Sequence, residues 1–513
     1  MRPPVSSSPS RPLLCGLLAA SLCLPGCLTM KPEPLTSAEI ARRNAAVREA
    51  LAATDEPLPA ELTLEYAFAR ALKRNLDRQV KAMETAIAFG QFDLARFDTL
   101  PKLTAEAGYY HRDNESIVRS RDSVTGRPSL ANPSISSERN HVSTGVGPTW
   151  SLLDFGTSYF SAKQAGDRAL SAVERRRKST HLLLAEVRSA FWRVAVAQRL
   201  EGELTRTLAE AEAALDEGRR LERERLRAPV ESLRLQKALL ENIRQLEALR
   251  QEMAAARIEL ASLLSAPAGA QLVVKEPGFV LPPGLADIPA ADLERAALAH
   301  NPDLAVSQYD VRISQQEARK AITKLFPSVT FDYQLRHDTD SYMINNSWQT
   351  ASARISFDLF RLATLGRDLE AIELGEELAQ RKQAAMLMAV VAQVHLSRLE
   401  YRSALQAYGR ADELAAVEGR LRDIAVRQGK EELQSRIEVV ATRTSALLSV
   451  GQRYHAIVQA QAAMGRMQST LGFDPVLEPA LDLSTEELAR RLAAYQAGWQ
   501  EGTWVNDLSK QPR

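Results

Sequence analysis

Long stretches without proline dominate this chain of 513 residues. They run from Thr157 to Ala228, from Val230 to Ala266 and from Arg361 to Asp474, and their residues favour helix. Each helical residue adds about 1.5 Å, so a helix of about 60 to 70 residues is about 100 Å long. Such helices are longer than a globular domain needs, so we expect an elongated architecture.

The last of these stretches contains an apolar seam. Its residues are separated alternately by three and four positions, which is the heptad spacing of a coiled coil. Thr, Gly and Gln within the seam favour close packing in a wide assembly over a tight dimer. The seam consists of Ile437, Val440, Thr444, Leu447, Gly451, Tyr454, Val458 and Gln461.

Four shorter segments alternate between apolar and polar residues. In the segment FPSVTFDYQLRHD, the apolar set begins with Val329 and Phe331, and the polar set with Thr330 and Asp332. Such alternation predicts a β-strand whose two faces meet different surroundings. The other three segments are Leu100–Asp113, Val142–Gly156 and Thr350–Phe360.

The sequence contains an internal repeat. Residues Leu62–Val80 match Ala291–Val306, and the same displacement along the chain brings Pro101 onto Pro327. The matched identities are Ala71, Leu72, Asn75 and Asp77 with Ala297, Leu298, Asn301 and Asp303. Each copy is predicted to hold a helix, a strand pair and a long helical hairpin. The connection between the paired strands is longer in the first copy, and its Ser, Arg, Asn and Pro predict an exposed loop.

The N-terminus has the features of a secretory signal. Arg2 and Arg11 precede the apolar run Leu13–Gly26, which is too short to span a bilayer stably. Its end, LPGC, resembles a bacterial lipobox, which would make Cys27 the site of lipid attachment. Cys27 would then be the one cysteine left in the mature chain, without an intrachain disulfide partner. The alternative is an ordinary signal peptide with a chance cysteine.

The polar faces of the predicted strands carry charged side chains. Charged groups cannot be buried dry without partners, but they can line water. Strands of about ten residues have the length needed to cross the hydrocarbon of a bilayer when tilted. We therefore expect lipid on the apolar face and an aqueous channel lumen on the other, although a soluble sheet with one wet face is the alternative. The predicted lumen residues are Glu106, Asp332, Arg336, Arg354 and Asp358.

Four strands cannot close a barrel by themselves. An open sheet edge in lipid leaves backbone groups unpaired, at several kcal/mol each. The barrel must therefore be shared between subunits.

This arrangement resembles the TolC-type outer-membrane efflux proteins over nearly all of the mature length. The resemblance rests on LTLEYAFARAL, ALAHNPDL, the prolines before each rising strand, WSLLDFG at Trp150–Gly156 and the duplicated plan. It implies an α+β membrane protein: a homotrimer with a twelve-stranded β-barrel, four strands per chain, continued by a long α-helical coiled-coil barrel. Such proteins are passive ducts of efflux or type I secretion systems. They sit in outer-membrane lipid, extend into the periplasm, and join an inner-membrane transporter through a periplasmic adaptor.

The family's helix turns usually carry Gly followed six residues later by Asp. Here Gly429 matches but is followed by Ser435, while the first copy has Arg225 and Glu231 at these positions. The resemblance places the adaptor-contacting tips at Ala228, Pro229 and Gly429. The residues Glu431, Ser435 and Glu438 share one helix face and would form an acidic periplasmic gate. The alternative is that they are solvated residues outside the tube.

Other functions find little support in the sequence. The 65 basic residues balance the 64 acidic ones, so no net charge attracts nucleic acid. The motifs GxxxxGK[ST], GxSxG and HExxH are missing. The seven histidines never occur at helical metal-ligand spacing, although His111, His141 and His337 fall near loops and His395 and His455 suit a seam or an interface. We therefore expect that the protein is not an enzyme and binds no cofactor or metal.

The remaining rival is a lipid-anchored periplasmic helical scaffold or adaptor that does not conduct, but adaptors carry additional β-domains with many short strands. The expected divisions are a signal at 1–26, a tether at 27–60, a first repeat at 61–270, a linker at 271–290, a second repeat at 291–475 and a tail at 476–513.

Overall fold

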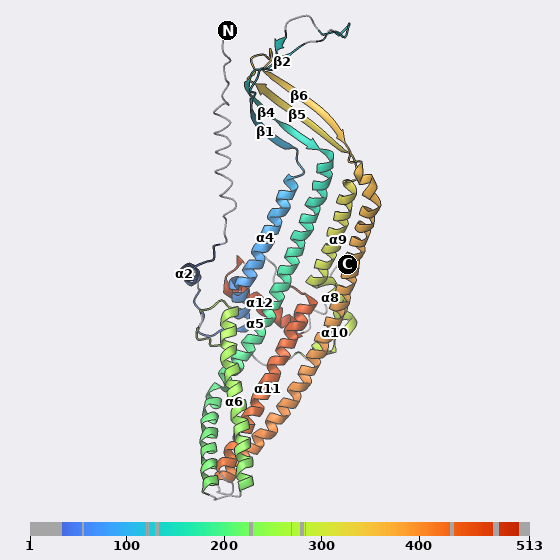
Figure 1. Cartoon of the computed structure of the whole chain (residues 1–513). Helices are drawn as coiled ribbons and strands as arrows, with labels where there is room; N and C mark the ends of the chain where they lie inside the picture. Colours follow the sequence, from blue (N-terminus) through green and yellow to red (C-terminus); the bar gives the residue numbers. More distant parts are fainter. Residues whose placement is uncertain are drawn as a thin grey trace. The chain divides into compact units, whose positions relative to one another are not determined.

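The computed structural model describes residues 33–53, 56–119, 121, 123–128, 133–224, 229–267, 269–276, 282, 284–430, 436–475 and 482–501. The chain divides into two units, residues 1–58 and 59–513. In the first unit, helix α2 (Ser37–Ala53) has no buried residue. The second unit holds the rest of the fold (Figure 1).

The second unit contains two copies of one succession of elements. The first copy comprises α3 (Leu64–Arg74), α4 (Leu76–Phe97), β1 (Lys102–His111), β4 (Asn140–Ser151), α5 (Leu152–Arg223) and α6 (Pro229–Leu263). The second comprises α8 (Ala290–His300), α9 (Pro302–Thr323), β5 (Ser328–Asp338), β6 (Ser347–Ser356), α10 (Phe360–Lys430) and α11 (Arg436–Leu471). Outside this plan lie β2 (Ile117–Val118), β3 (Ser134–Ile135), α7 (Gly284–Asp287) and α12 (Thr485–Glu501).

The duplication agrees with the sequence prediction almost residue by residue. The first residues of α4 and α9, Leu76 and Pro302, are related by the same displacement as Pro101 and Pro327. The first residues of α6 and α11, Pro229 and Arg436, are closer together along the chain. The two displacements differ because the first copy has the additional β2–β3 hairpin between its paired strands.

Local signals set the starts of the helices. Thr63 accepts a hydrogen bond from the Tyr66 backbone N–H at the start of α3, and Asn75 ends α3 and caps α4. Ser151 caps α5 by accepting from the Asp154 N–H at 3.1 Å. The cap corrects one predicted boundary: Leu152–Gly156 is the first turn of α5 and not the end of a strand, because the capped turn outweighs the apolar pattern.

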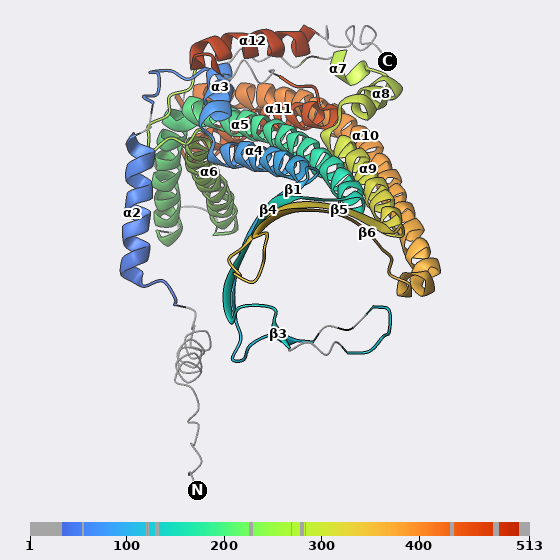
Figure 2. The same cartoon turned by 90° about the horizontal axis from the view of Figure 1, so that it is seen from above.

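The four predicted strands form one antiparallel sheet in the order β1-β4-β5-β6. Sequential strands pair in register, with Glu106 opposite Gly145, Phe331 opposite Ala353 and Trp150 opposite Phe331. Seen from above, the sheet is a curved strip (Figure 2). Its outer strands, β1 and β6, have no further strand partner among the described residues.

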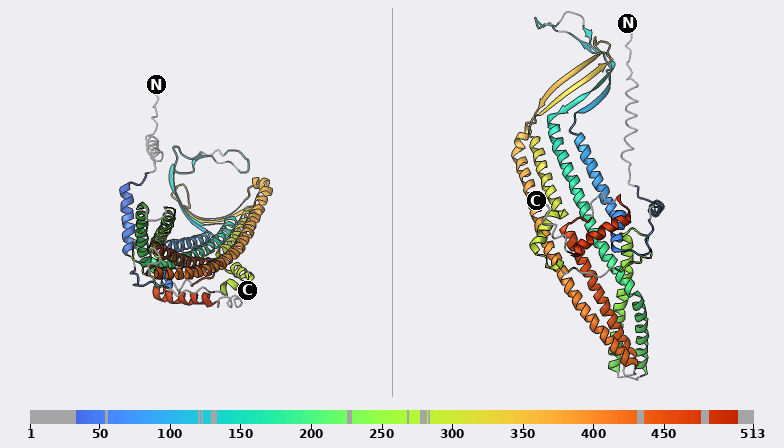
Figure 3. Two further views of the ribbon diagram at one scale, coloured as in Figure 1. Left: turned by 90° about the horizontal axis from the view of Figure 1, so that it is seen from below. Right: turned by 180° about the vertical axis from the view of Figure 1, so that it is seen from behind.

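The long helices lie side by side below the sheet (Figures 1 and 3). Next to the sheet, α4 packs on α5, α5 on α9 and α9 on α10. Farther away, α5 packs on α6 and α11, and α11 on α10. The predicted heptad seam of α11 is confirmed, because seven of its eight residues are buried and Tyr454 is half-buried. It joins a core of α5, α6 and α11 side chains that includes Leu204, Leu239 and Leu246.

Candidate channel wall and helix junction

The polar face of the sheet carries a connected set of side chains from three strands. Arg336 Nη2 lies 3.5 Å from Glu106 Oε1, and Arg336 donates from Nε and Nη2 to Gln334 Oε1 at 2.9 and 2.7 Å. Gln334 in turn donates to Asp332 Oδ2 at 3.3 Å, and the Thr149 hydroxyl donates to the same oxygen at 2.6 Å. These contacts tie β1, β4 and β5 together on one face.

Two glycines of β4 lie beneath this network. A Cβ at Gly145 would sit 2.9 Å from Glu106 Oε1, so any side chain there would displace the carboxylate. A Cβ at Gly147 would overlap the Tyr333 carbonyl oxygen, which is backbone and cannot move aside. The middle of β4 therefore projects no side chain at Gly145 and Gly147 on the polar face.

The other face is apolar and uncovered within the described chain. Leu103 is 75% exposed, Ile355 73% and Phe331 45%. Aromatic rings gather on this face where the sheet meets the helices: Trp150 lies 6.3 Å from Phe331 and 5.8 Å from Phe155, between ring centroids. An uncovered apolar face of this extent calls for an apolar environment or a partner.

The predicted lumen residues have different positions. Glu106, Asp332, Arg336 and Arg354 lie within strands and share the polar face, since paired residues of adjacent strands project to the same side. Asp358 lies two residues past β6, and its Oδ1 accepts the Phe360 N–H at 3.0 Å. The prediction that strand alternation orients Asp358 is therefore wrong, because the strand has ended.

Both edges of the helix layer beside the sheet are apolar. Helix α4 packs on α5 and α10 on α9, so α4 and α10 are the edges. On α4, six exposed side chains follow a heptad-like spacing: Leu76, Val80, Met83, Ile87, Leu94 and Phe97. On α10, the exposed residues with helical spacing are Leu374, Leu378, Met388 and Leu399. Each stripe matches the face of a helix that packs against another helix.

At the far ends of the hairpins, some predicted residues lie within the described chain. Pro229 begins α6. A Cβ at Gly429 would lie 2.7 Å from the Val439 side chain, so α10 and α11 approach closely there. Glu438 is half-buried in the first turn of α11. The predicted Ala228, Glu431, Ser435 and Cys27 lie outside the described residues.

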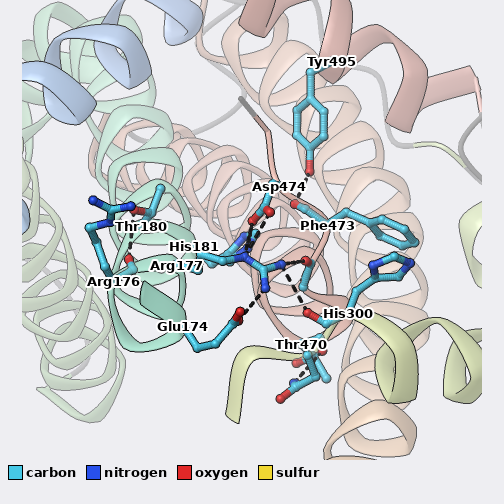
Figure 4. Close-up of polar contacts among 12 residues, drawn as sticks. Glu174, Arg176, Arg177, Thr180, His181, His300, Thr470, Phe473, Asp474 and Tyr495 are labelled. Atoms are coloured by element: carbon cyan, nitrogen blue, oxygen red, sulfur yellow. Dashed lines mark hydrogen bonds and ion pairs between the residues drawn. The ribbon is translucent and has the colours of Figure 1, made fainter. Parts of the chain in front are cut away.

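A polar junction ties α5 to the ends of α8 and α11 (Figure 4). Arg177 Nε lies 3.0 Å from both carboxylate oxygens of Asp474, and His181 Nε2 lies 3.1 Å from Asp474 Oδ1. Arg177 also pairs with Glu174 and donates to the carbonyl oxygens of His300 and Gly472. One guanidinium thus connects three helices. Sequence reasoning missed this junction, although the basic run Arg175–Lys178 inside a helix was a visible signal.

Electrostatics at this junction favour the ion pair. Burial alone would raise the pKa of Asp474, but hydrogen bonds from His181 and Arg177 outweigh it and hold that pKa below its ordinary value. Burial and the Arg177 charge lower the pKa of His300, with Asp474 opposing. The His300 ring packs against Phe473 at 4.7 Å, and the Tyr495 hydroxyl of α12 donates to the Phe473 carbonyl oxygen at 3.1 Å.

Helix α12 is held by a buried arginine. Arg188 of α5 donates to the side-chain oxygens of Gln461, Gln468 and Gln496 at 3.3, 3.1 and 2.6 Å. Burial lowers the pKa of Arg188 to about 10. Three amide oxygens accept hydrogen bonds from this guanidinium, so the cation joins α5, α11 and α12 through neutral groups.

Three histidines within the described ranges each lie beside one polar side chain. His111 Nδ1 lies 2.7 Å from Asn140 Oδ1, His337 Nδ1 lies 2.9 Å from Ser347 Oγ, and His395 Nε2 lies 2.9 Å from Glu294 Oε1. Within the described ranges no group of three or more His, Cys, Asp or Glu residues is placed to hold a metal ion. None of the helices in those ranges carries a stretch apolar enough to cross a bilayer.

Comparison with known proteins agrees with this architecture. Residues 67–266 match the model of a family described as outer membrane efflux protein. That description names a transport protein and not an enzyme. A search of curated proteins found no match.

Solved structures show the same fold. A membrane protein from Pseudomonas aeruginosa matches with a TM-score of 0.62 and 16% identity, over 81% of this chain and 91% of that one. The open state of the MtrE outer membrane channel of Neisseria gonorrhoeae matches with a TM-score of 0.59 and 18% identity, over 80% of this chain and 88% of that one. The CmeC outer membrane channel of Campylobacter jejuni matches with a TM-score of 0.61 and 11% identity, over 83% of this chain and 89% of that one. The chain thus shares the fold of these membrane proteins.

Proposed function

We propose that this chain is the outer-membrane exit duct of a tripartite efflux or type I secretion system, built as a homotrimer. The observation that carries the proposal is the two-faced sheet. Its apolar face is exposed at Phe331 and Leu103, and its polar face holds a network of Glu106, Arg336 and Asp332. Lipid outside and water inside satisfy both faces at once.

The open edges support sharing between chains. Strands β1 and β6 end the described sheet, and α4 and α10 end the adjoining helix layer with apolar stripes. A second copy placed edge to edge would pair β6 with β1 and cover the α4 stripe with the α10 stripe. Three such contacts would close a barrel of twelve strands and leave no edge in lipid.

Coupling to other proteins belongs to the same proposal. The hairpin tips at Pro229 and Gly429 would meet a periplasmic adaptor, which would join the duct to an inner-membrane transporter. Glu438, with Glu431 and Ser435, would face the pore as an acidic gate. Cys27 would carry the lipid anchor in the outer membrane. The domain divisions given above remain predictions.

Two measurements test the duct. Outer-membrane fractions run on unheated gels should show a species of trimer mass that collapses to the monomer on boiling. The purified protein should give discrete conductance steps in planar bilayers. A monomeric protein without conductance would favour the periplasmic scaffold and refute the duct. For the anchor, Cys27→Ala should abolish labelling with palmitate, and persistent labelling would contradict the lipobox.

A further inference from the structure

A hollow of about 550 Å³ lies on the sheet along one row of paired residues. The row takes one residue from each strand: Glu106, Gly145, Arg336 and Trp348. Paired residues project to one side of a sheet, so the carboxylate, the guanidinium and the indole share the polar face. Gly145 has no side chain, so the Glu106 carboxylate can lie over it.

The two charges of this row are fixed and still accessible. Arg336 is held by Gln334 at 2.7 Å and by Glu106 at 3.5 Å, on the side of the hollow formed by β5. The side chain of Arg336 is 40% exposed and that of Glu106 62%. A dissolved molecule could therefore contact both groups without unfolding anything around them.

We propose that this hollow binds small zwitterions that carry an aromatic ring. The ammonium group would contact Glu106, the carboxylate would receive hydrogen bonds from the Arg336 guanidinium, and the ring would pack on Trp348. A simple cation would be repelled by Arg336 and a simple anion by Glu106. The spacing of the two charges thus selects a molecule that carries both.

The site rests on the proposed function only for its access, since the polar face is then the wall of the lumen. Arg336 lies two residues before the end of β5, so the hollow is nearer the loops than the helices. A barrel of three chains would hold three such hollows at one level. They would be contact sites for the exported molecule, distinct from a gate at the helix tips.

The test uses three probes with one aromatic frame. Phenylalanine is a zwitterion, phenylalanine amide is a cation and N-acetylphenylalanine is an anion. Each is added to the protein in a planar bilayer, and excess current noise reports transient binding. We expect the zwitterion to bind at least about fivefold more strongly than either analogue. Equal binding of the three probes would overturn the proposal.

Variants assign the two charges. Glu106→Gln should remove the preference of the zwitterion over the anion, and Arg336→Gln should remove its preference over the cation. Gly145→Val should displace the Glu106 carboxylate and so weaken binding of the zwitterion. The control is Arg354→Gln, which removes a charge from the same face outside the row and should change nothing. Unchanged probe preferences in the Glu106 and Arg336 variants would refute the site.

A second measurement does not depend on conductance. Fluorine NMR of 4-fluorophenylalanine with the detergent-solubilised protein should show line broadening that Arg336→Gln and Glu106→Gln abolish. Broadening in a protein that fails to conduct would keep the binding site and reject the duct. Conductance without probe binding in either assay would keep the duct and reject the site.

Discussion

Asn75 and Asn301 make the same two contacts in the two halves of the chain. Asn75 accepts the Arg78 N–H through Oδ1 and donates from Nδ2 to the Leu263 carbonyl oxygen at 3.2 Å. Asn301 accepts the Leu304 N–H and donates to the Thr470 carbonyl oxygen at 2.9 Å. Each asparagine thus caps the helix that rises to the sheet and fastens the end of the hairpin that returns from the far tip.

Replacing either asparagine should destabilise the fold by a similar amount. Asn75→Ala or Asn301→Ala loses a helix cap, worth about 1 kcal/mol, and leaves a carbonyl oxygen without its donor, at about 1 to 3 kcal/mol. Thermal unfolding of the detergent-solubilised protein measures the loss. The matched variants Asn75→Asp and Asn301→Asp keep the cap but lose the donor, so they should fall between wild type and alanine if the two contacts are separable. A wild-type melting temperature for the alanine variants would contradict the shared role.

A residue just past the end of α6 and the equivalent residue after α11 both have positive φ, but one is serine and the other is glycine. Ser265 has φ of +49°, and Gly472, which occupies the equivalent position after α11, has φ of +74°. Ser265→Gly should raise the stability by about 1 kcal/mol, because a side chain is unfavourable in the left-handed region. The melting temperature of the solubilised protein measures the gain.

Gly472→Ala is the converse change. Its Cβ would overlap the His300 carbonyl oxygen, so it should destabilise the junction by more than the serine costs in the first copy. A neutral Gly472→Ala variant would show that α11 and α8 can separate there without loss.

The architecture was predictable where the signal is local and periodic. Strand alternation, the heptad seam of α11 and the duplication each repeat over many residues, so they survive small errors of boundary. Arg177 and Asp474 carried no such signal, because they are 297 residues apart and meet only when α11 returns to α5. The alternation of β6 likewise stopped being informative at Asp358, where the backbone leaves the sheet.

The junction should weaken as the pH falls. The pKa of His300 is lowered in the folded state, so below its ordinary value of about 6.5 the unfolded chain binds a proton that the folded chain does not. Stability therefore decreases as the pH falls from about 7 to 5. The lowered pKa of Asp474 adds a second loss of the same sign below about pH 4. Thermal unfolding measured from about pH 7 to below pH 4 covers both steps.

The variant His300→Phe separates this effect from the other groups at the junction. It keeps a ring against Phe473 but cannot titrate, while Arg177, Glu174, His181 and Asp474 remain. The fall in melting temperature between pH 7 and pH 5 should be smaller in the variant than in wild type. An unchanged fall would assign the pH dependence to groups elsewhere in the chain.

Two neighbouring residues of β6 distinguish a membrane barrel from a soluble sheet. Ala353 is paired with Phe331 on the apolar face, and Ser352 is paired with Asp332 on the polar face; both are small and exposed. Ala353→Arg would place a charge in lipid and should cost about 2 to 4 kcal/mol near the middle of the bilayer. Ser352→Arg would place the same charge in water beside a carboxylate and should be nearly neutral. The yield of heat-modifiable trimer in outer membranes measures each effect, with Ser352→Arg as the matched control for the size and charge of arginine. Equal yields from the two variants would mean that both faces meet water, which would refute the lipid-facing assignment.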